Sequence, residues 1–257
     1  MTGTDATASS GGAAPTWRAI AAMTAMELRL AMRRGETLLA TAVLPVVVLV
    51  FFSSVGVVSI PGRPVDFLLP GSIAFAIIAT SLVSLGITTA YDRFYGVLKR
   101  LGGSPLSRGE LVTARILAVL VVESVQVAVL VAAASLLLGW SAPADASAGL
   151  FVVAVLLGTI AFAGLGLLLA GTLRAETMLA VANALFVASL ILGGIVLPIY
   201  QLPAPLAAVA AALPAAALSD ALRIALGAPG DAAGPLALLA GWGVATVGLA
   251  VATFRWE

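Results

Sequence analysis

Apolar runs of about 20 residues recur along this chain of 257 residues, and they constrain its fold more than any other feature. Each run, coiled as a helix, is long enough to cross the roughly 30 Å hydrocarbon layer of a bilayer. The runs are continuously apolar rather than alternating, which argues against a membrane β-barrel. The sequence therefore predicts an all-α membrane protein. We expect six transmembrane helices, at about residues 37–60, 67–90, 111–139, 148–173, 177–197 and 235–254.

The distribution of basic residues predicts the orientation of these helices. With the segments between spans assigned to alternate sides, eleven of the thirteen basic residues fall on one side and only Arg63 and Arg223 on the other. Basic residues concentrate on the cytoplasmic side of membrane proteins. We therefore expect both chain ends in the cytoplasm. The strong preference for Arg over Lys, with abundant Ala and Gly, is typical of a GC-rich genome, and we expect a multi-pass protein of a bacterial cell membrane.

The first 34 residues divide into two parts. Residues 1–15 are small, polar and turn-rich, so we expect a disordered tail, and they lack the pattern of a secretory signal. Residues 16–34 have the periodicity of an amphipathic helix lying in the membrane interface, although a solvated helix is the alternative. Its apolar side is predicted to comprise Trp17, Ile20, Ala21, Thr24, Leu28 and Ala31, and its basic side Arg18, Arg29 and Arg33. Residues 16–257 are expected to form one domain.

Residues 198–230 are apolar but interrupted by prolines, including Pro203 and Pro214. The pieces between the prolines are too short to cross a bilayer. Irregular backbone survives at membrane depth only where protein or a cavity surrounds it. We therefore predict a re-entrant helical hairpin on the outer side, in which Asp220 and Arg223 pair at i, i+3. An interfacial helix that serves only packing is the alternative.

Several classes of function are excluded by the residues present. The chain has no Cys and no His, which excludes disulfides, thiolate or imidazole metal sites and Ser–His catalysis. It has no phosphate-binding G-x-x-x-x-G-K-[ST] motif, so it is not by itself a P-loop ATPase. The net charge of +1 gives no indication of a nucleic-acid partner. We expect no enzyme activity and no cofactor in this chain.

Glu123 is the one carboxylate well inside a predicted span, and Gln126 follows it on nearly the same helix face. A carboxylate in the membrane is costly and must face protein or a watery cavity. These residues are therefore candidates for a polar transport pathway or a coupling contact. An interhelical hydrogen bond is an equally good interpretation. Asn183 is a third pathway candidate, for which a structural hydrogen bond is the simpler explanation.

The stretch between the second and third spans, YDRFYGVLKRLGGSPLSRGELVTAR, is the most polar part of the chain. Gly102, Gly103 and Pro105 punctuate it sharply, which predicts a short, rigid cytoplasmic element fixed between the two spans. An ordinary positive-inside loop is the alternative. It would explain the charges, but it would leave Leu98, Leu101 and the Gly–Pro turn unexplained.

The order of residues in this stretch resembles a family. Asp92–Arg93, Gly96–Leu98, Arg100–Leu101 and the turn around Pro105 resemble the loop after the second span of type-2 ABC exporter permeases, in the drug-efflux branch that is similar to daunorubicin-resistance proteins. The order Pro203, Pro214, Asp220, Arg223 resembles the segment before the last span of the same family. Phe94–Tyr95 departs from the pattern, because many relatives have an acidic residue near this position.

The resemblance implies a permease subunit that forms a homodimer and binds two cytoplasmic ATPase subunits, which carry ATP and Mg on separate chains. Residues 92–101 would then be a cytoplasmic coupling helix, and the coupling residues would be Asp92, Arg93, Gly96, Leu98, Arg100, Leu101 and Pro105. The implied activity is ATP-driven export of a hydrophobic or amphipathic substrate, such as a drug, antibiotic or lipid-like molecule, by alternating access at the dimer interface. A secondary transporter, which would require more intramembrane ionisable groups, and a non-transporting scaffold are the alternatives.

Overall fold

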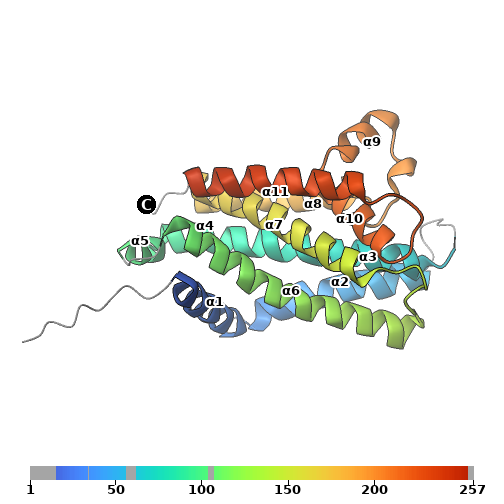
Figure 1. Cartoon of the computed structure of the whole chain (residues 1–257), viewed down its shortest axis with the longest axis horizontal. Coiled ribbons are helices and arrows are strands. Elements are labelled where there is room, and N and C mark those ends of the chain that lie inside the picture. Colours follow the sequence, from blue (N-terminus) through green and yellow to red (C-terminus); the bar gives the residue numbers. More distant parts are fainter. Residues whose placement is uncertain (1–15, 34, 56–61, 104–106, 254–257) are drawn as a thin grey trace, which may run out of the picture.

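The computed structural model describes residues 16–33, 35–55, 62–103 and 107–253, without the side chains of residues 35–41. The described part is almost entirely helical and contains no strand (Figure 1). The predicted tail and Pro105 lie outside it. The α-helices are α1 (Thr16–Arg33), α2 (Gly35–Val55), α3 (Pro64–Ile78), α4 (Leu85–Phe94), α5 (Val97–Gly102), α6 (Arg108–Leu138), α7 (Ala148–Thr172), α8 (Ala175–Leu192), α9 (Ala204–Ala211), α10 (Pro214–Ala225) and α11 (Ala233–Thr253), joined by the π-helical segment η1 (Ala79–Ser84) and the 3-10 turn η2 (Ile199–Gln201).

Five helices in the described residues are long and apolar enough to cross a membrane. One of them combines α3, η1 and α4 into a single helix, Pro64–Phe94, which is longer at both ends than the predicted span. The others are α6, α7, α8 and α11. The described apolar part of α2, Ala42–Val55, is shorter, and α9 with α10 would make one further span if the bent pair were counted as one. The prediction of an all-α protein with about six membrane-capable helices is therefore confirmed, while its orientation stays a prediction.

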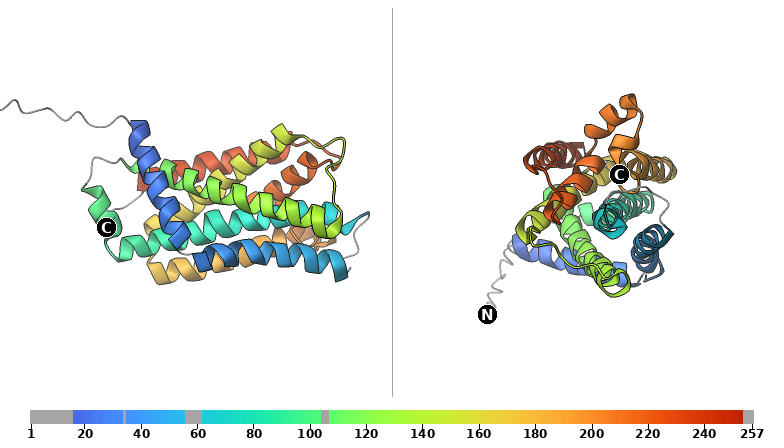
Figure 2. Two further views of the ribbon diagram at one scale, coloured as in Figure 1. Left: turned by 90° about the horizontal axis from the view of Figure 1, so that it is seen from below. Right: turned by 90° about the vertical axis from the view of Figure 1, so that its right-hand side faces the viewer.

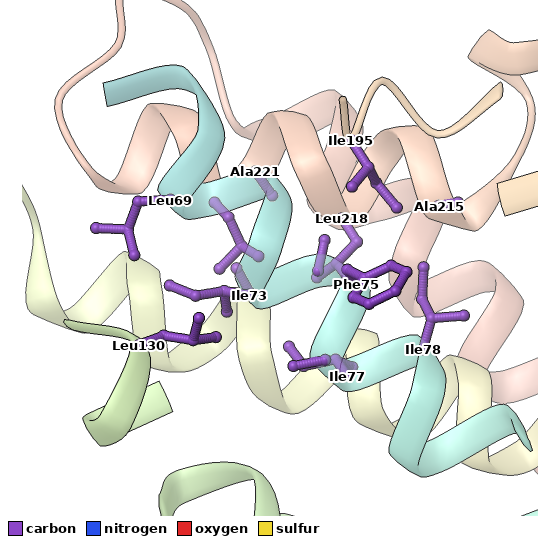
Figure 3. Packing of buried hydrophobic residues seen from close by; sticks show 14 of the residues in the cluster. Leu69, Ile73, Phe75, Ile77, Ile78, Leu130, Ile195, Ala215, Leu218 and Ala221 are labelled. Atoms are coloured by element: carbon purple, nitrogen blue, oxygen red, sulfur yellow. The ribbon is translucent and has the colours of Figure 1, made fainter. Parts of the chain in front are cut away.

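The helix Pro64–Phe94 is the most buried of the five and forms the centre of the bundle, as the end-on view in Figure 2 shows. The core is made of aliphatic side chains that α3 shares with α6 and α10. Ile73 and Ile77 lie close to Leu130 of α6 and to Leu218 of α10 (Figure 3). These buried apolar contacts fix α3 relative to its neighbours.

The helices α7 and α11 pack closely because small residues line their contact, as is common between membrane helices. A Cβ added at Gly164 of α7 would lie 2.4 Å from the hydroxyl oxygen of Thr246 and 2.9 Å from the backbone nitrogen of Val247, both on α11. The Thr246 hydroxyl donates a hydrogen bond of 3.2 Å to the Ala161 carbonyl of α7. Small size at residue 164 is therefore a packing requirement.

The segment before α11 contains the two short helices α9 and α10, which meet at an angle of 78°. Pro203 and Pro214 stand at the starts of these helices, where proline is tolerated. The predicted pair is confirmed: Arg223 Nη1 lies 3.1 Å from Asp220 Oδ1. Arg223 also stacks over the Phe67 ring at 4.0 Å and donates to the Gly194 carbonyl. A break between two helices agrees with the expected hairpin, whose outer, re-entrant placement stays a prediction.

The N-terminal helix α1 crosses the long helices at a steep angle (Figure 2, left). Ile20, Thr24 and the rest of its inner face pack toward α6. On the predicted apolar side Trp17 is 65% exposed and Ala21 is also exposed, whereas Met23 is buried. The side that packs on the protein therefore differs from that apolar side, whose placement in a membrane interface stays a prediction. The inner side is rotated toward Met23 because α6 and α5 lie there, while Arg18, Arg29 and Arg33 are exposed as predicted.

We predict that Gly164→Ala destabilises the bundle by about 1–3 kcal/mol, since overpacking forces α7 and α11 apart. The free energy of unfolding is measured by titrating the purified protein from mixed micelles into SDS. Gly149→Ala, on the same helix with no atom within 4 Å of its added Cβ, is the matched control. It should be neutral or stabilising by up to about 1 kcal/mol. Equal effects of the two substitutions would contradict the packing role.

Candidate functional site: the elbow and its supports

The predicted cytoplasmic helix over residues 92–101 is in fact two elements joined at a bend. Asp92 and Arg93 belong to the last turn of α4, the helix ends at Phe94, and α5 begins at Val97. Between them Gly96 has a φ of +70°, a left-handed conformation that glycine adopts without strain. The predicted single helix is therefore corrected to an elbow, because Gly96 turns the chain before α5.

The chain leaves α5 and enters α6 through a capping box at Ser107. The Ser107 hydroxyl accepts a 3.2 Å bond from the Glu110 N–H, and the Ser107 N–H donates a 2.7 Å bond to the Glu110 carboxylate. These two bonds satisfy backbone donors that a helix start leaves unpaired. The start of α6 is thus well defined by local sequence.

Leu98 attaches α5 to the rest of the protein. It is fully buried in a cluster with Met23 of α1 and with Leu111 and Ala114 of α6, and Leu101 packs against the same cluster. The apolar residues that the sequence singled out in α5 therefore face inward. They hold the elbow against α1 and α6.

Arg115 joins three helices at the base of α6. Its side chain is 2% exposed. Its Nη2 lies 2.6 Å from Asp92 Oδ2 on α4, and its Nε lies 3.1 Å from Glu27 Oε1 on α1. Its Nη1 also donates to the Thr89 hydroxyl. A buried guanidinium needs such partners, because an uncompensated charge there would cost several kcal/mol.

From the sequence alone, Arg115 was only one of the eleven basic residues that predict the orientation, and Glu27 was not predicted to have a role. A signal was present, since Glu27 follows Thr24 by three residues and so lies on the same helix face. Thr24 itself donates a 3.3 Å hydrogen bond to the Ala114 carbonyl. An acidic residue on the inner face of a helix indicates a buried basic partner.

Arg93 points to the opposite side of the elbow from Asp92. Its guanidinium donates to the carbonyls of Gly171 and Leu173, where α7 ends. The last carbonyls of a helix lack intrahelical partners and carry partial negative charge, so a cation is favourable there. The neighbouring residues Asp92 and Arg93 thus connect α4 to α6 and α1 on one side and to α7 on the other.

The exposed side of the elbow is aromatic and basic. Phe94 is 71% and Tyr95 67% exposed, and their ring centroids lie 5.2 Å apart. Val97, Lys99 and Arg100 are exposed beside them. We call these five residues the elbow surface. It lies at one end of the bundle, with α9 and α10 at the other, so Pro203, Pro214, Asp220 and Arg223 are far from it (Figure 1).

Glu123 and Gln126 lie in a buried hydrogen-bond cluster between helices. The Glu123 Oε2 accepts a hydrogen bond from Thr159 of α7, and Gln126 Oε1 accepts a 3.0 Å bond from Thr80 of η1. Asn183 is elsewhere: it is exposed on α8 and donates a 2.8 Å bond to the Leu179 carbonyl of its own helix. The structure does not bring these three candidates together, and a pathway role for them stays a prediction.

Two cavities border α4. The larger, of about 530 Å³, is mainly apolar and lies between α2 and α8, with Pro45, Phe186 and Asn183 among its lining residues. We call it the α2–α8 cleft. The smaller, of about 150 Å³, lies between α1, α4 and α6 beside Arg115. Both are lined by Ser84, Thr88 and Asp92. Among the described residues no group of three acidic, His or Cys side chains could hold a metal ion.

We predict that Asp92→Asn lowers the free energy of unfolding by about 1–3 kcal/mol, because the buried Arg115 loses an ionised partner. Asp231→Asn is the matched control. Asp231 is exposed and accepts a bond from the Ala233 N–H, which asparagine accepts equally well at a helix start. SDS titration of both variants measures the difference. An Asp92→Asn effect no larger than the control would contradict the buried ion pair.

The family model of the ABC-2 type transporter matches residues 18–226, from α1 through α10. No curated protein matches the chain. The matched region includes the buried elbow supports, the central helix and the paired helices α9 and α10. The chain therefore belongs to the ABC-2 type transporter family and is the membrane permease component of an ABC transporter.

Proposed function

We propose that this chain is the permease half of an ATP-driven exporter in a bacterial cytoplasmic membrane, that it works as a homodimer, and that separate ATPase chains dock on its elbow surface. The family and the missing phosphate-binding motif support this proposal. ATP and Mg²⁺ would be bound by the partner chains. The drug-efflux branch is the proposed position within the family.

The observation that carries the proposal is the exposed aromatic pair on the elbow. Phe94 is the last residue of the helix Pro64–Phe94 and Tyr95 follows it, and both rings are largely exposed although they contact each other. Exposed aromatic side chains beside arginine are typical of protein-binding hot spots. With Lys99 and Arg100 beside them, a fitting partner surface is an apolar groove with an acidic rim.

The contacts that hold the elbow would transmit a displacement caused by such a partner to the neighbouring helices. Leu98 holds α5 against α1 and α6, so α5 cannot slide independently. Asp92 connects α4 to Arg115, and Arg93 connects it to the end of α7. A displacement of the elbow would therefore move α4, α6 and α7 together, which is what alternating access requires.

The α2–α8 cleft is the proposed route of the cargo. Its volume of about 530 Å³ falls within the range of drug-sized binding sites. Phe75, Ile87 and Phe186 give it an apolar lining, and Asn183 adds a hydrogen-bonding group. A hydrophobic or amphipathic cargo fits this lining better than a highly charged one. In a homodimer, a second copy facing α2 and α8 would close the cleft.

The alternatives carry less support from the geometry. A secondary transporter would need a relay of ionisable groups. Glu123 is buried against Thr159 and Gln126 against Thr80, without a second carboxylate among the described contacts of this cluster. A non-transporting scaffold would give no reason for the α2–α8 cleft.

We predict that Phe94→Ser with Tyr95→Ser weakens binding of the ATPase subunit about 30-fold or more, since truncating a hot-spot aromatic costs about 2 kcal/mol. Binding is measured by co-purification and by titration of the purified ATPase. Tyr200→Ser removes an equally exposed aromatic at the other end of the bundle and is the control. Undiminished binding by the double variant would overturn the docking site.

We also predict that Asn183→Leu changes which compounds stimulate ATP hydrolysis by the reconstituted complex, while basal hydrolysis and complex formation stay unchanged. The substitution removes a hydrogen-bonding group from the cleft lining. Val187→Leu, exposed one turn further along α8 and outside that lining, is the control. An unaltered compound profile would argue against the cleft as the cargo route.

A further inference from the structure

The segment Ala79–Ser84 is a π-helix in the middle of the most buried span. Its sequence, ATSLVS, contains neither proline nor glycine, so local propensity does not explain it. A π-turn is rare within an α-helix and is frequently found at functional sites. Contacts from neighbouring helices must therefore stabilise it.

Those contacts come from α6 and α7. The Thr80 hydroxyl donates a 3.0 Å bond to Gln126 Oε1. Ser81 lies beside the Glu123 carboxyl group, which also accepts a bond from Thr159. A Cβ at Gly166 would lie only 2.9 Å from the Ser81 carbonyl oxygen, so a glycine lets α7 approach the widened turn.

The π segment separates two differently supported halves of one helix. The outer half, α3, packs mainly against α2, α6 and α10, whereas the inner half, α4, packs mainly against α7 and α8 and carries the elbow (Figure 1). Motion at η1 would thus leave the outer half in place and move the half that bears the elbow surface.

We propose that Ala79–Ser84 is a register hinge, and that Gln126 and Glu123 are positioning residues that hold it in its π-helical form. This proposal rests on the proposed function, because a docked ATPase supplies the push. Conversion of the π-turn to regular α-helix would absorb its extra residue, so α4 would turn by about 100° relative to α3 and shift by about 1.5 Å along the axis.

Such a rotation has a direct consequence for the two cavities. Ser84, Thr88 and Asp92 form a polar stripe that lies on the border between the α2–α8 cleft and the smaller cavity beside Arg115. Turning the stripe would take its hydroxyl and carboxylate groups out of one cavity and into the other. The hinge therefore changes the polarity of the cargo route when the elbow moves.

The test measures the hinge in the full-length permease in lipid nanodiscs, without the ATPase. The chain has no cysteine, so Asp66→Cys and Phe94→Cys, both at exposed positions, accept spin labels selectively. Twenty-eight residues separate them, and a straight helix would place them about 42 Å apart, within reach of pulsed EPR.

Thr80→Val, which keeps the side-chain shape but removes the donor to Gln126, should shift the ratio of two distance populations about five- to tenfold, the effect of losing one buried hydrogen bond. Thr246→Val is the matched control, since it removes a buried hydroxyl bond between α7 and α11 that does not touch η1. Thr80→Ser, which keeps the donor, should restore the original distances. Unchanged distances in Thr80→Val, or an equal shift in Thr246→Val, would overturn the hinge.

Should Thr80→Val not fold, Gln126→Met removes the acceptor instead and supports the same comparison. A second readout separates this inference from the proposed function. In the reconstituted complex, Thr80→Val should keep ATPase binding but transport several-fold less cargo per ATP. A distance shift without any ATPase binding to the wild-type chain would refute the proposed function alone. Normal ATPase binding with unchanged distances and unchanged transport per ATP would refute the hinge alone.

Discussion

The buried guanidinium of Arg115 makes the interactions on which the elbow end of the bundle depends. A charge with 2% exposure must be compensated, and the two compensating carboxylates come from different elements, Asp92 of α4 and Glu27 of α1. Because each partner is needed to offset the cost of burial, α1, α4 and α6 are held together. The helix α1 is in this way part of the same unit as the elbow.

The residues of the elbow divide into a buried group and an exposed group. Leu98 anchors α5 inside the protein, and Phe94 and Tyr95 remain outside it. Two charged residues hold the elbow in place: Arg93 binds the end of α7, and Asp92 pairs with Arg115. The proposed docking surface and the residues that support it are therefore neighbours in the chain that face different ways.

The middle of the central helix is held by buried polar groups. There the bundle keeps polar groups in apolar surroundings, with Thr80 bonded to Gln126 and Thr159 bonded to Glu123. Each such bond is needed, since an unpaired polar group at this depth is expensive. The π-turn lies beside these bonds, so tight packing and polar groups both occur at the junction between α3 and α4.

Much of the fold followed from the sequence alone, because apolar length determines which segments can be membrane helices and because the order of glycine, proline and charged residues is specific to the family. The Asp220–Arg223 pair was predictable for a similar reason, since i, i+3 neighbours on a helix meet wherever the helix lies. The capping box at Ser107 and Glu110 is likewise encoded within four residues.

Other features depended on which helix lies alongside. Apolar residues suit both lipid and protein, so periodicity could not tell that Leu98 faces inward while Trp17 and Phe94 face outward. Glu27 became a partner of Arg115 only when α1 crossed the base of α6. The π-turn at Ala79–Ser84 has no local signature, because Gln126 and Gly166, far along the chain, provide its contacts. The sequence by itself determined the helices and the family; tertiary packing decided which faces meet, since that depends on free energies shared between distant residues.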